Sequence, residues 1–112
     1  MKYNFKVTAQ FAKDFKKLKK SNKAIVADFD LFLQKFDNAL GKTIAGTGGA
    51  KKIRMAASEK GKRGGYRVIY YLFYENEVYF IKIYSKSVKE DISMSEKRMI
   101  SELVTRIKNR NA

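Results

Sequence analysis

The sequence predicts an α+β fold: a compact single domain with the element order β-α-α-β-β-β-α, an antiparallel-rich sheet, a helical hairpin and a C-terminal helix. Three observations support this prediction. The chain has 112 residues, of which 45% are hydrophobic, and that length suits one domain with one core. Apolar residues alternate with polar ones at the N-terminus and in the second half, as in strands, and recur at helical spacing elsewhere. No internal repeat or linker divides the chain, so residues 1–112 are treated as one domain.

The N-terminus is predicted to form a strand and then a short helix. Apolar side chains occupy alternate positions of the strand, at Tyr3, Phe5 and Val7. Thr8 is a candidate N-cap. The residues after it repeat an apolar side chain at helical spacing, at Phe11, Phe15 and Leu18. Lysines surround this stripe, so the helix should be amphipathic with a basic outer face.

A second helix is predicted directly after Ser21 and Asn22, which interrupt the first helix and can cap the second. Its apolar stripe is long and rich in aromatic residues. It comprises Ile25, Val26, Phe29, Phe32, Leu33, Phe36 and Leu40. We expect these phenylalanines to form core. Because the connection is very short, the two helices should form an antiparallel hairpin.

The second half of the chain is predicted to supply most of the sheet and the last helix. All seven glycines lie between Gly41 and Gly65, where the backbone must turn often. The predicted strands are Lys51–Ala56, Tyr66–Tyr74 and Val78–Ser85, with a turn at Glu75–Glu77. Ser95 is a candidate N-cap for the final helix. The apolar stripe of that helix is Met99, Leu103, Val104 and Ile107.

The net charge and the missing residue types limit the classes of function that the chain can have. Lys and Arg number 25 against 11 Asp and Glu, a net charge of +14, which indicates a polyanionic partner, nucleic acid first and anionic membrane second. No apolar run approaches the roughly 18 residues of a membrane span, and no signal peptide is evident, so we expect a cytoplasmic protein without a membrane partner. The chain has no Cys and no His, which excludes disulfides, thiolate metal sites and imidazole catalysis. We expect neither a metal nor a cofactor.

Strand parity predicts a cationic sheet face. The residues that it places together are Lys52, Arg54, Arg67, Lys82, Tyr84 and Lys86, with Ile81 and Ile83 on the opposite face. Arg makes bidentate contacts to phosphates and Tyr offers a stacking plane. For Lys82, protection of a strand edge is the alternative. A basic glycine-rich loop lies beside this face, and the residues predicted to contact RNA are Lys60, Lys62, Arg63, Tyr66 and Tyr84.

Three stretches resemble the HigB branch of the RelE/ParE superfamily of toxins. They are 44–54 with its GTGG and K-x-R patterns, 61–71 with GKRGG-x-R-x-I-Y-Y, and 83–86. The resemblance covers essentially the whole chain and implies a RelE-like fold. It also implies the toxin of a type II toxin-antitoxin pair, a ribosome-dependent, metal-independent endoribonuclease that cuts mRNA in the ribosomal A site. A cognate antitoxin, often a helix-turn-helix protein like HigA, would neutralise it.

The resemblance assigns catalytic roles to a set of basic residues: Lys52, Arg54, Arg67 and Lys86. Where RelE itself has an Arg and a Tyr after the last strand, this chain has Ser87 and Ser93. The general acid and base therefore stay open among Tyr84, Tyr66 and the lysines. The chemistry needs no metal if the 2′-hydroxyl of the RNA attacks the adjacent phosphate and the arginines stabilise the charge that develops.

Two other functions remain open from sequence alone. One is a ParE-like toxin that inhibits gyrase by binding, without catalysis. The K-x-R pattern of Lys52 and Arg54, joined to Arg67, favours the ribonuclease, because ParE-like chains typically lack it. The other is a generic RNA-binding module, for which the charge of +14 would suffice.

Overall fold

The computed structural model describes residues 2–58, 65–87, 89 and 91–110 and confirms the α+β fold. The elements in chain order are β1 (Asn4–Val7), α1 (Ala9–Ser21), α2 (Ile25–Gln34), the 3₁₀ helix η1 (Asn38–Leu40), β2 (Lys42–Thr43), β3 (Lys51–Met55), β4 (Tyr66–Phe73), β5 (Glu77–Ser85) and α3 (Met94–Arg110). One five-stranded sheet runs in the order β1-β5-β4-β3-β2. It is mixed, because β1 is parallel to β5 and the other pairs are antiparallel.

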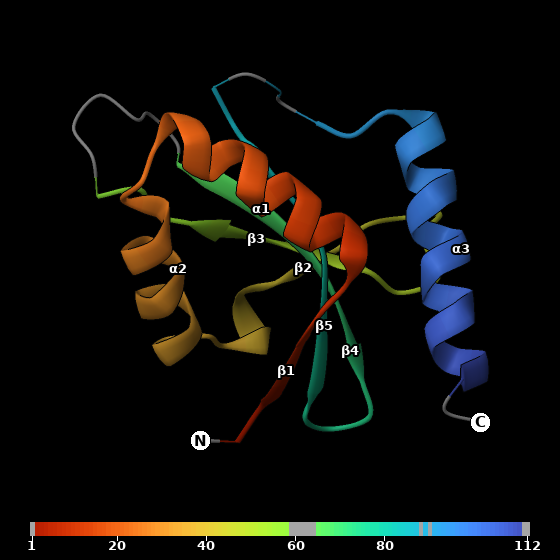
Figure 1. Ribbon diagram of the computed structural model, residues 1–112. Coiled ribbons are helices and arrows are strands. Elements are labelled where there is room, and N and C mark those ends of the chain that lie inside the picture. The colour runs from red at the N-terminus through yellow and green to blue at the C-terminus, as the bar shows by residue number, and fades with distance from the viewer. Residues whose placement is uncertain (1, 59–64, 88, 90, 111–112) are drawn as a thin grey trace.

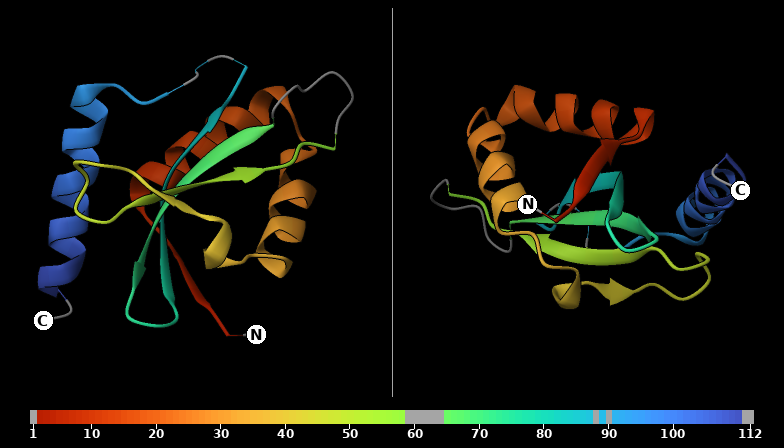
Figure 2. Two further views of the ribbon diagram at one scale, coloured as in Figure 1. Left: turned by 180° about the vertical axis from the view of Figure 1, so that it is seen from behind. Right: turned by 90° about the horizontal axis from the view of Figure 1, so that it is seen from below.

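α1 and α2 cover one face of the sheet, and α3 stands at its side (Figures 1 and 2). α1 and α2 enclose one apolar cluster, and α3 encloses a second on the other side, where Ile100 and Val104 pack against Ile69 and Ile81. Two cores form because the central strands β4 and β5 are buried on both faces. No helix among the described residues is long and apolar enough to span a bilayer.

Phe80 of β5 is the centre of the core under α1 and α2. Its side chain is 0% exposed. Rings from β1, both helices and the turn after α2 surround it at centroid distances of 5.5 to 6.1 Å: Phe5, Phe11, Phe29, Phe32 and Phe36. Tilted, stacked and edge-on ring pairs of this kind add to the free energy of apolar burial. The expectation that the phenylalanines of the second helix form core is confirmed.

Thr8 begins α1 as predicted and also ties the helix to the sheet. Its Oγ1 accepts a hydrogen bond from the N–H of Phe11 at 3.2 Å and donates to the carbonyl of Phe80 at 2.9 Å. Asn22 ends α1, its N–H donating to the carbonyl of Leu18 at 3.0 Å, and its Oδ1 accepts from the N–H of Ala24 at 3.2 Å. Asn22 therefore makes hydrogen bonds both to the last turn of α1 and to the residue before α2.

The prediction that the apolar stripe from Ile25 to Leu40 lies on one continuous helix is wrong. α2 ends at Gln34, and Asp37 starts the separate turn η1 by accepting from the N–H of Ala39 at 2.9 Å. Phe36 still reaches the core, but Val26 and Leu40 are exposed. The cap at Asp37 starts a new turn, so the helical spacing of the apolar residues does not continue as one helix to Leu40.

The cap of the last helix is Ser93 rather than Ser95. Ser93 Oγ accepts from the N–H of Glu96 at 3.2 Å, and the Glu96 carboxylate accepts from the N–H of Ser93 at 2.8 Å. This reciprocal arrangement is a capping box, which satisfies two N–H groups at the helix start. α3 therefore begins at Met94.

The alternation predicted for the last strand fails at one position. Ile69 pairs with Lys82 and Tyr70 pairs with Phe80, so Ile81 is an extra residue, a β-bulge. Ile83 lies on the α1–α2 side as predicted, but Ile81 joins the cluster under α3, on the same side as Tyr84. The strand bounds otherwise differ from prediction by one residue, and the two-residue strand β2 was missed because it is too short to show periodicity.

Replacing the central ring tests this description of the core. Phe80→Ala should lower the free energy of unfolding by about 3 to 5 kcal/mol, because it removes a fully buried ring and leaves a cavity. Phe73→Ala, at the partly exposed end of β4, is the matched control and should cost clearly less. Urea unfolding followed by circular dichroism measures both, and equal losses would contradict the central role of Phe80.

Candidate functional site

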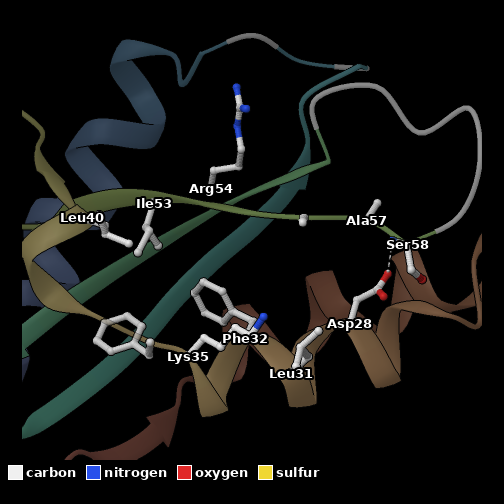
Figure 3. A pocket seen from close by; sticks show the side chains of 11 residues that line it. Asp28, Leu31, Phe32, Lys35, Leu40, Ile53, Arg54, Ala57 and Ser58 are labelled. Atoms are coloured by element: carbon white, nitrogen blue, oxygen red, sulfur yellow. Dashed lines mark hydrogen bonds between the residues drawn. The ribbon is translucent and has the colours of Figure 1, made fainter.

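The structure brings three of the predicted basic residues together on the α3 side of the sheet. Arg54 of β3 lies directly opposite Arg67 of β4, which lies directly opposite Tyr84 of β5. Lys52 is on the same face of β3, two residues before Arg54. These four residues form the cationic row. Figure 3 shows the Arg54 side chain extending away from α2, as strand parity predicts.

The arginine pair costs folding free energy, since like charges directly opposite each other destabilise a sheet. Among the described residues, the ion pairs involve Lys82 and Lys89 and leave both arginines without a carboxylate. Arg54 is exposed and Arg67 is half-buried. Two guanidinium groups so placed form a site at which an oxyanion would relieve the repulsion.

Lys86 lies at the same end of the sheet as the arginine pair. It follows β5 directly, and its N–H donates to the carbonyl of Gly65 at 3.1 Å. Gly65 has a φ of +61°, and a Cβ there would lie 2.4 Å from the carbonyl oxygen of Met55. Glycine is therefore required at this close approach, which holds the ends of β3, β4 and β5 together.

The loop residues Lys60, Lys62 and Arg63 lie outside the described residues. Their predicted contacts with RNA stay predictions.

Tyr66 and Tyr84, both predicted to contact RNA, lie in different surroundings. Tyr66 is in the core under α1 and α2, is 3% exposed, and its hydroxyl accepts a hydrogen bond from the side-chain amide of Asn22 at 2.6 Å. This placement gives Tyr66 a structural role, and we leave it out of the site. Tyr84 is also buried, at 8% exposed, in the cluster under α3, but it lies directly opposite Arg67 on that side of the sheet and therefore stays in the site.

Tyr84 keeps its proton at neutral pH. Burial raises the pKa of its hydroxyl, the charges of Asp91 and Glu96 raise it further, and the charge of Arg67 acts in the opposite direction. The Nζ of Lys89 lies 5.7 Å from the centroid of the Tyr84 ring, so part of the ring face is occupied by a cation. The hydroxyl is therefore suited to donate a proton rather than to accept one.

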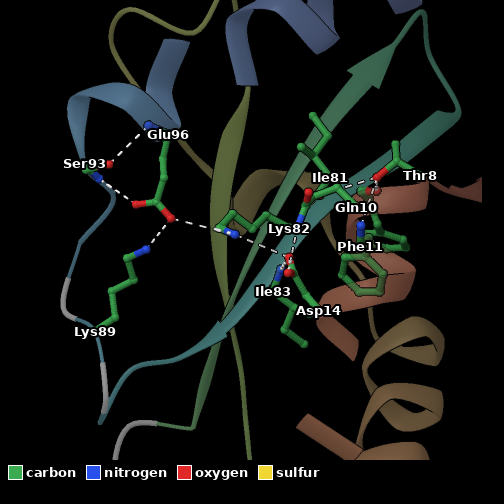
Figure 4. Close-up of polar contacts among 11 residues, drawn as sticks. Thr8, Gln10, Phe11, Asp14, Ile81, Lys82, Ile83, Lys89, Ser93 and Glu96 are labelled. Carbon is green, nitrogen blue, oxygen red and sulfur yellow. Dashed lines mark hydrogen bonds and ion pairs between the residues drawn. The ribbon is translucent and has the colours of Figure 1, made fainter. Parts of the chain in front are cut away.

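Strand parity places Lys82 on the same sheet face as Arg54 and Arg67, but acidic side chains neutralise its charge. Its Nζ lies 3.5 Å from Asp14 Oδ2 on α1 and 3.7 Å from Glu96 Oε2 on α3 (Figure 4). The same Glu96 oxygen accepts from Lys89. Lys82 thus links both helices to β5, and this partly buried network has a structural role.

Glu96 and Lys89 were missed by the sequence analysis. Burial by itself would raise the pKa of the Glu96 carboxyl, but hydrogen bonds from Lys89 and Ser93 and the charge of Lys89 outweigh it and hold the pKa below its ordinary value of 4.5. The spacing of Ser93 and Glu96 matches a capping box and was a usable signal for Glu96. Lys89 lies in an irregular segment, where periodicity gives no signal.

Among the residues that the structure describes, acidic side chains do not gather into a group of three or more that could hold a metal ion. Compared with known protein families, residues 5–112 match the family described as RelE toxin of the RelE / RelB toxin-antitoxin system. The chain belongs to the RelE family. As a RelE-family toxin it has a cognate antitoxin as partner, and the cationic row lies on a fold typical of that family.

The Glu96 network makes a testable contribution to stability. Because the pKa of Glu96 is lowered in the folded state, its stabilisation is complete above the ordinary value of 4.5 and is lost as pH falls through the folded-state pKa. Glu96→Gln should therefore destabilise the protein by about 1 to 2 kcal/mol at pH 7, and the difference from the parent should vanish in acid.

Thermal unfolding between pH 7 and pH 3 measures this difference. Glu102→Gln, at an exposed position of α3, is the control and should change stability little at either pH. A Glu96→Gln deficit that stays constant with pH would show that the carboxylate charge plays no part.

Proposed function

We propose that this RelE-family toxin is a ribosome-dependent mRNA endonuclease of the HigB branch, acting in the cytoplasm. The supporting observation is the pair of cross-strand arginines, Arg54 opposite Arg67, with Lys52 and Tyr84 beside them on one sheet face. A pair of unneutralised guanidinium groups fits a phosphodiester that gains negative charge during reaction.

The proposed reaction uses the RNA as its own nucleophile. The 2′-oxygen attacks the adjacent phosphorus, the bond from phosphorus to the 5′-oxygen breaks, and the products are a 2′,3′-cyclic phosphate and a 5′-hydroxyl. One proton leaves the 2′-hydroxyl and one is added to the 5′-oxygen, so the step balances without water as a reactant. Arg54 and Arg67 stabilise the non-bridging oxygens of the pentavalent phosphorane.

Proton transfer falls to the neighbours of the arginine pair. Tyr84 retains its proton at neutral pH and lies beside Arg67, so we assign it to protonate the leaving 5′-oxygen. Lys52 and Lys86 remain as candidates for accepting the 2′-proton. The chain has no His, and a ribosome that orients the mRNA would supply much of the remaining rate through positioning.

The outer face of α1 supplies a docking surface for ribosomal RNA. Its exposed lysines are Lys13, Lys16, Lys17, Lys19 and Lys20. Asp14, the acidic residue of this helix, is turned toward Lys82 and the N–H of Ile83. The charged side chains on the solvated face of α1 are therefore all basic, and phosphate contacts there would add affinity that falls with salt.

The arginine pair gives the first test of this function. Induced without its antitoxin, the parent chain should arrest growth and cleave translated mRNA. Arg67→Ala should reduce cleavage by roughly 10²- to 10³-fold, because it removes a donor to the transition state, while ribosome binding stays nearly unchanged. Primer extension on translated message and co-sedimentation with ribosomes measure the two properties separately.

Arg106→Ala, at an exposed position of α3, is the matched control and should cleave like the parent. Cleavage by Arg67→Ala at the parent rate would show that the proposed site is wrong. Growth arrest with DNA damage and intact mRNA would instead favour gyrase inhibition of the ParE type.

The basic face of α1 gives the complementary test. Changing Lys16 and Lys17 together to Ala should weaken ribosome binding and make it less dependent on salt, because two phosphate contacts are lost. The rate of the cut within the ribosome complex should stay near that of the parent. A double variant of exposed lysines elsewhere, Lys2 and Lys35, controls for net charge. If both double variants weaken binding equally, α1 is not the docking surface.

A further inference from the structure

The ring of Tyr84 is held by packing rather than through its hydroxyl. The side chain is buried in the cluster under α3, which also contains Ile92 and Ile100. Among the described residues, no group makes a hydrogen bond with the Tyr84 hydroxyl. Tyr84 also lines a groove of about 320 Å³ between α1 and the end of β5. A proton donor placed in this way has to be oriented through contacts with its ring.

Lys89 makes one of these contacts. Its Nζ lies 5.7 Å from the centroid of the Tyr84 ring, within the range of a cation–π interaction. Lys89 lines the same groove as Tyr84. Its side chain is 34% exposed and comes from the irregular segment between β5 and α3. Because a free lysine side chain has many rotamers, a second contact is needed to keep its ammonium group at the ring.

Glu96 provides that second contact. Its Oε2 accepts a hydrogen bond from Lys89 Nζ (Figure 4). Its Oε1 accepts from the N–H of Ser93 at 2.8 Å, so the carboxylate is itself fixed at the start of α3. Lys82 of β5 also lies 3.7 Å from the same Oε2. The carboxylate is therefore connected both to α3 and to the strand that carries Tyr84.

We propose that Lys89, held by Glu96, is a positioning residue that fixes the Tyr84 ring so that its hydroxyl meets the leaving 5′-oxygen. This rests on the proposed cleavage of mRNA and names the contact that orients its proton donor. Glu96 also balances the charge of Lys89. Burial is the main cause that raises the pKa of Tyr84, and the charges of Asp91 and Glu96 add to it, against the charge of Arg67. The pair therefore orients the phenol while the phenol keeps its proton.

Nuclear magnetic resonance of the free toxin tests the geometry, whether or not the toxin cleaves RNA. The methylene protons next to Lys89 Nζ should be shifted upfield by the ring current of Tyr84. Glu96→Gln should remove this upfield shift, because Lys89 loses its charged partner. Tyr84→Phe should keep it, because the aromatic ring remains. The inference is overturned if the parent shows no upfield shift, or if the full shift survives in Glu96→Gln.

Single-turnover cleavage in the ribosome complex tests the role in the reaction. Lys89→Met should slow the cut by roughly 10-fold, because the proton donor loses its orientation, while ribosome binding stays unchanged. Lys89→Arg should restore most of the rate, since it keeps a cation at the ring. Lys108→Met is the matched control. Lys108 Nζ also lies 5.7 Å from a tyrosine ring, that of Tyr71, which is outside the cationic row, and this variant should cleave like the parent.

A double variant separates positioning from direct contact with RNA. In a Tyr84→Phe background, Lys89→Met should cause no further loss, because Lys89 acts through the Tyr84 hydroxyl. A further loss of similar size would overturn the inference. Cleavage by Tyr84→Phe at the parent rate would remove the proton donor from the proposed function, and this inference with it. Slow cleavage by Tyr84→Phe together with parent cleavage by Lys89→Met would overturn the inference alone.

Discussion

The burial of Phe80 is the interaction on which the rest of the structure depends. Its ring is enclosed by side chains from β1, α1, α2 and the turn after α2. Its backbone carbonyl also accepts the hydrogen bond from Thr8 that starts α1. Because the same residue anchors the ring cluster and the first helix, the position of α1 on the sheet follows from the position of β5.

The β-bulge at Ile81 joins the two cores. With one extra residue in β5, Phe80 faces α1 and α2 while Ile81 and Tyr84 both face α3. A regular strand would have turned Ile81 into the first core and left α3 a smaller apolar surface. Bulges re-aim side chains at the cost of one unpaired residue, and here this places Tyr84 beside Arg67.

The basic residues of the sheet divide into two groups with different surroundings. Lys82 forms ion pairs with Asp14 of α1 and Glu96 of α3, and these pairs connect the two helices to β5. Arg54 and Arg67 receive no carboxylate among the described residues and stay available to an anion. Cations with and without a carboxylate partner therefore lie on one sheet face, and the difference is whether a helix brings an acidic residue to them.

The sequence by itself determined the element order, the basic face of α1 and the grouping of Lys52, Arg54 and Arg67, because these depend on local periodicity and strand parity. It also determined family membership, through the motifs around Arg54 and Arg67. Only the tertiary structure decided that Tyr66 is a core residue bound to Asn22 and that Lys82 is neutralised. Each of these depends on contacts between residues far apart in the chain or on strand pairing, which no local pattern encodes. The bulge that brings Ile81 to α3 was hidden for the same reason, since its register is set by the partner strand.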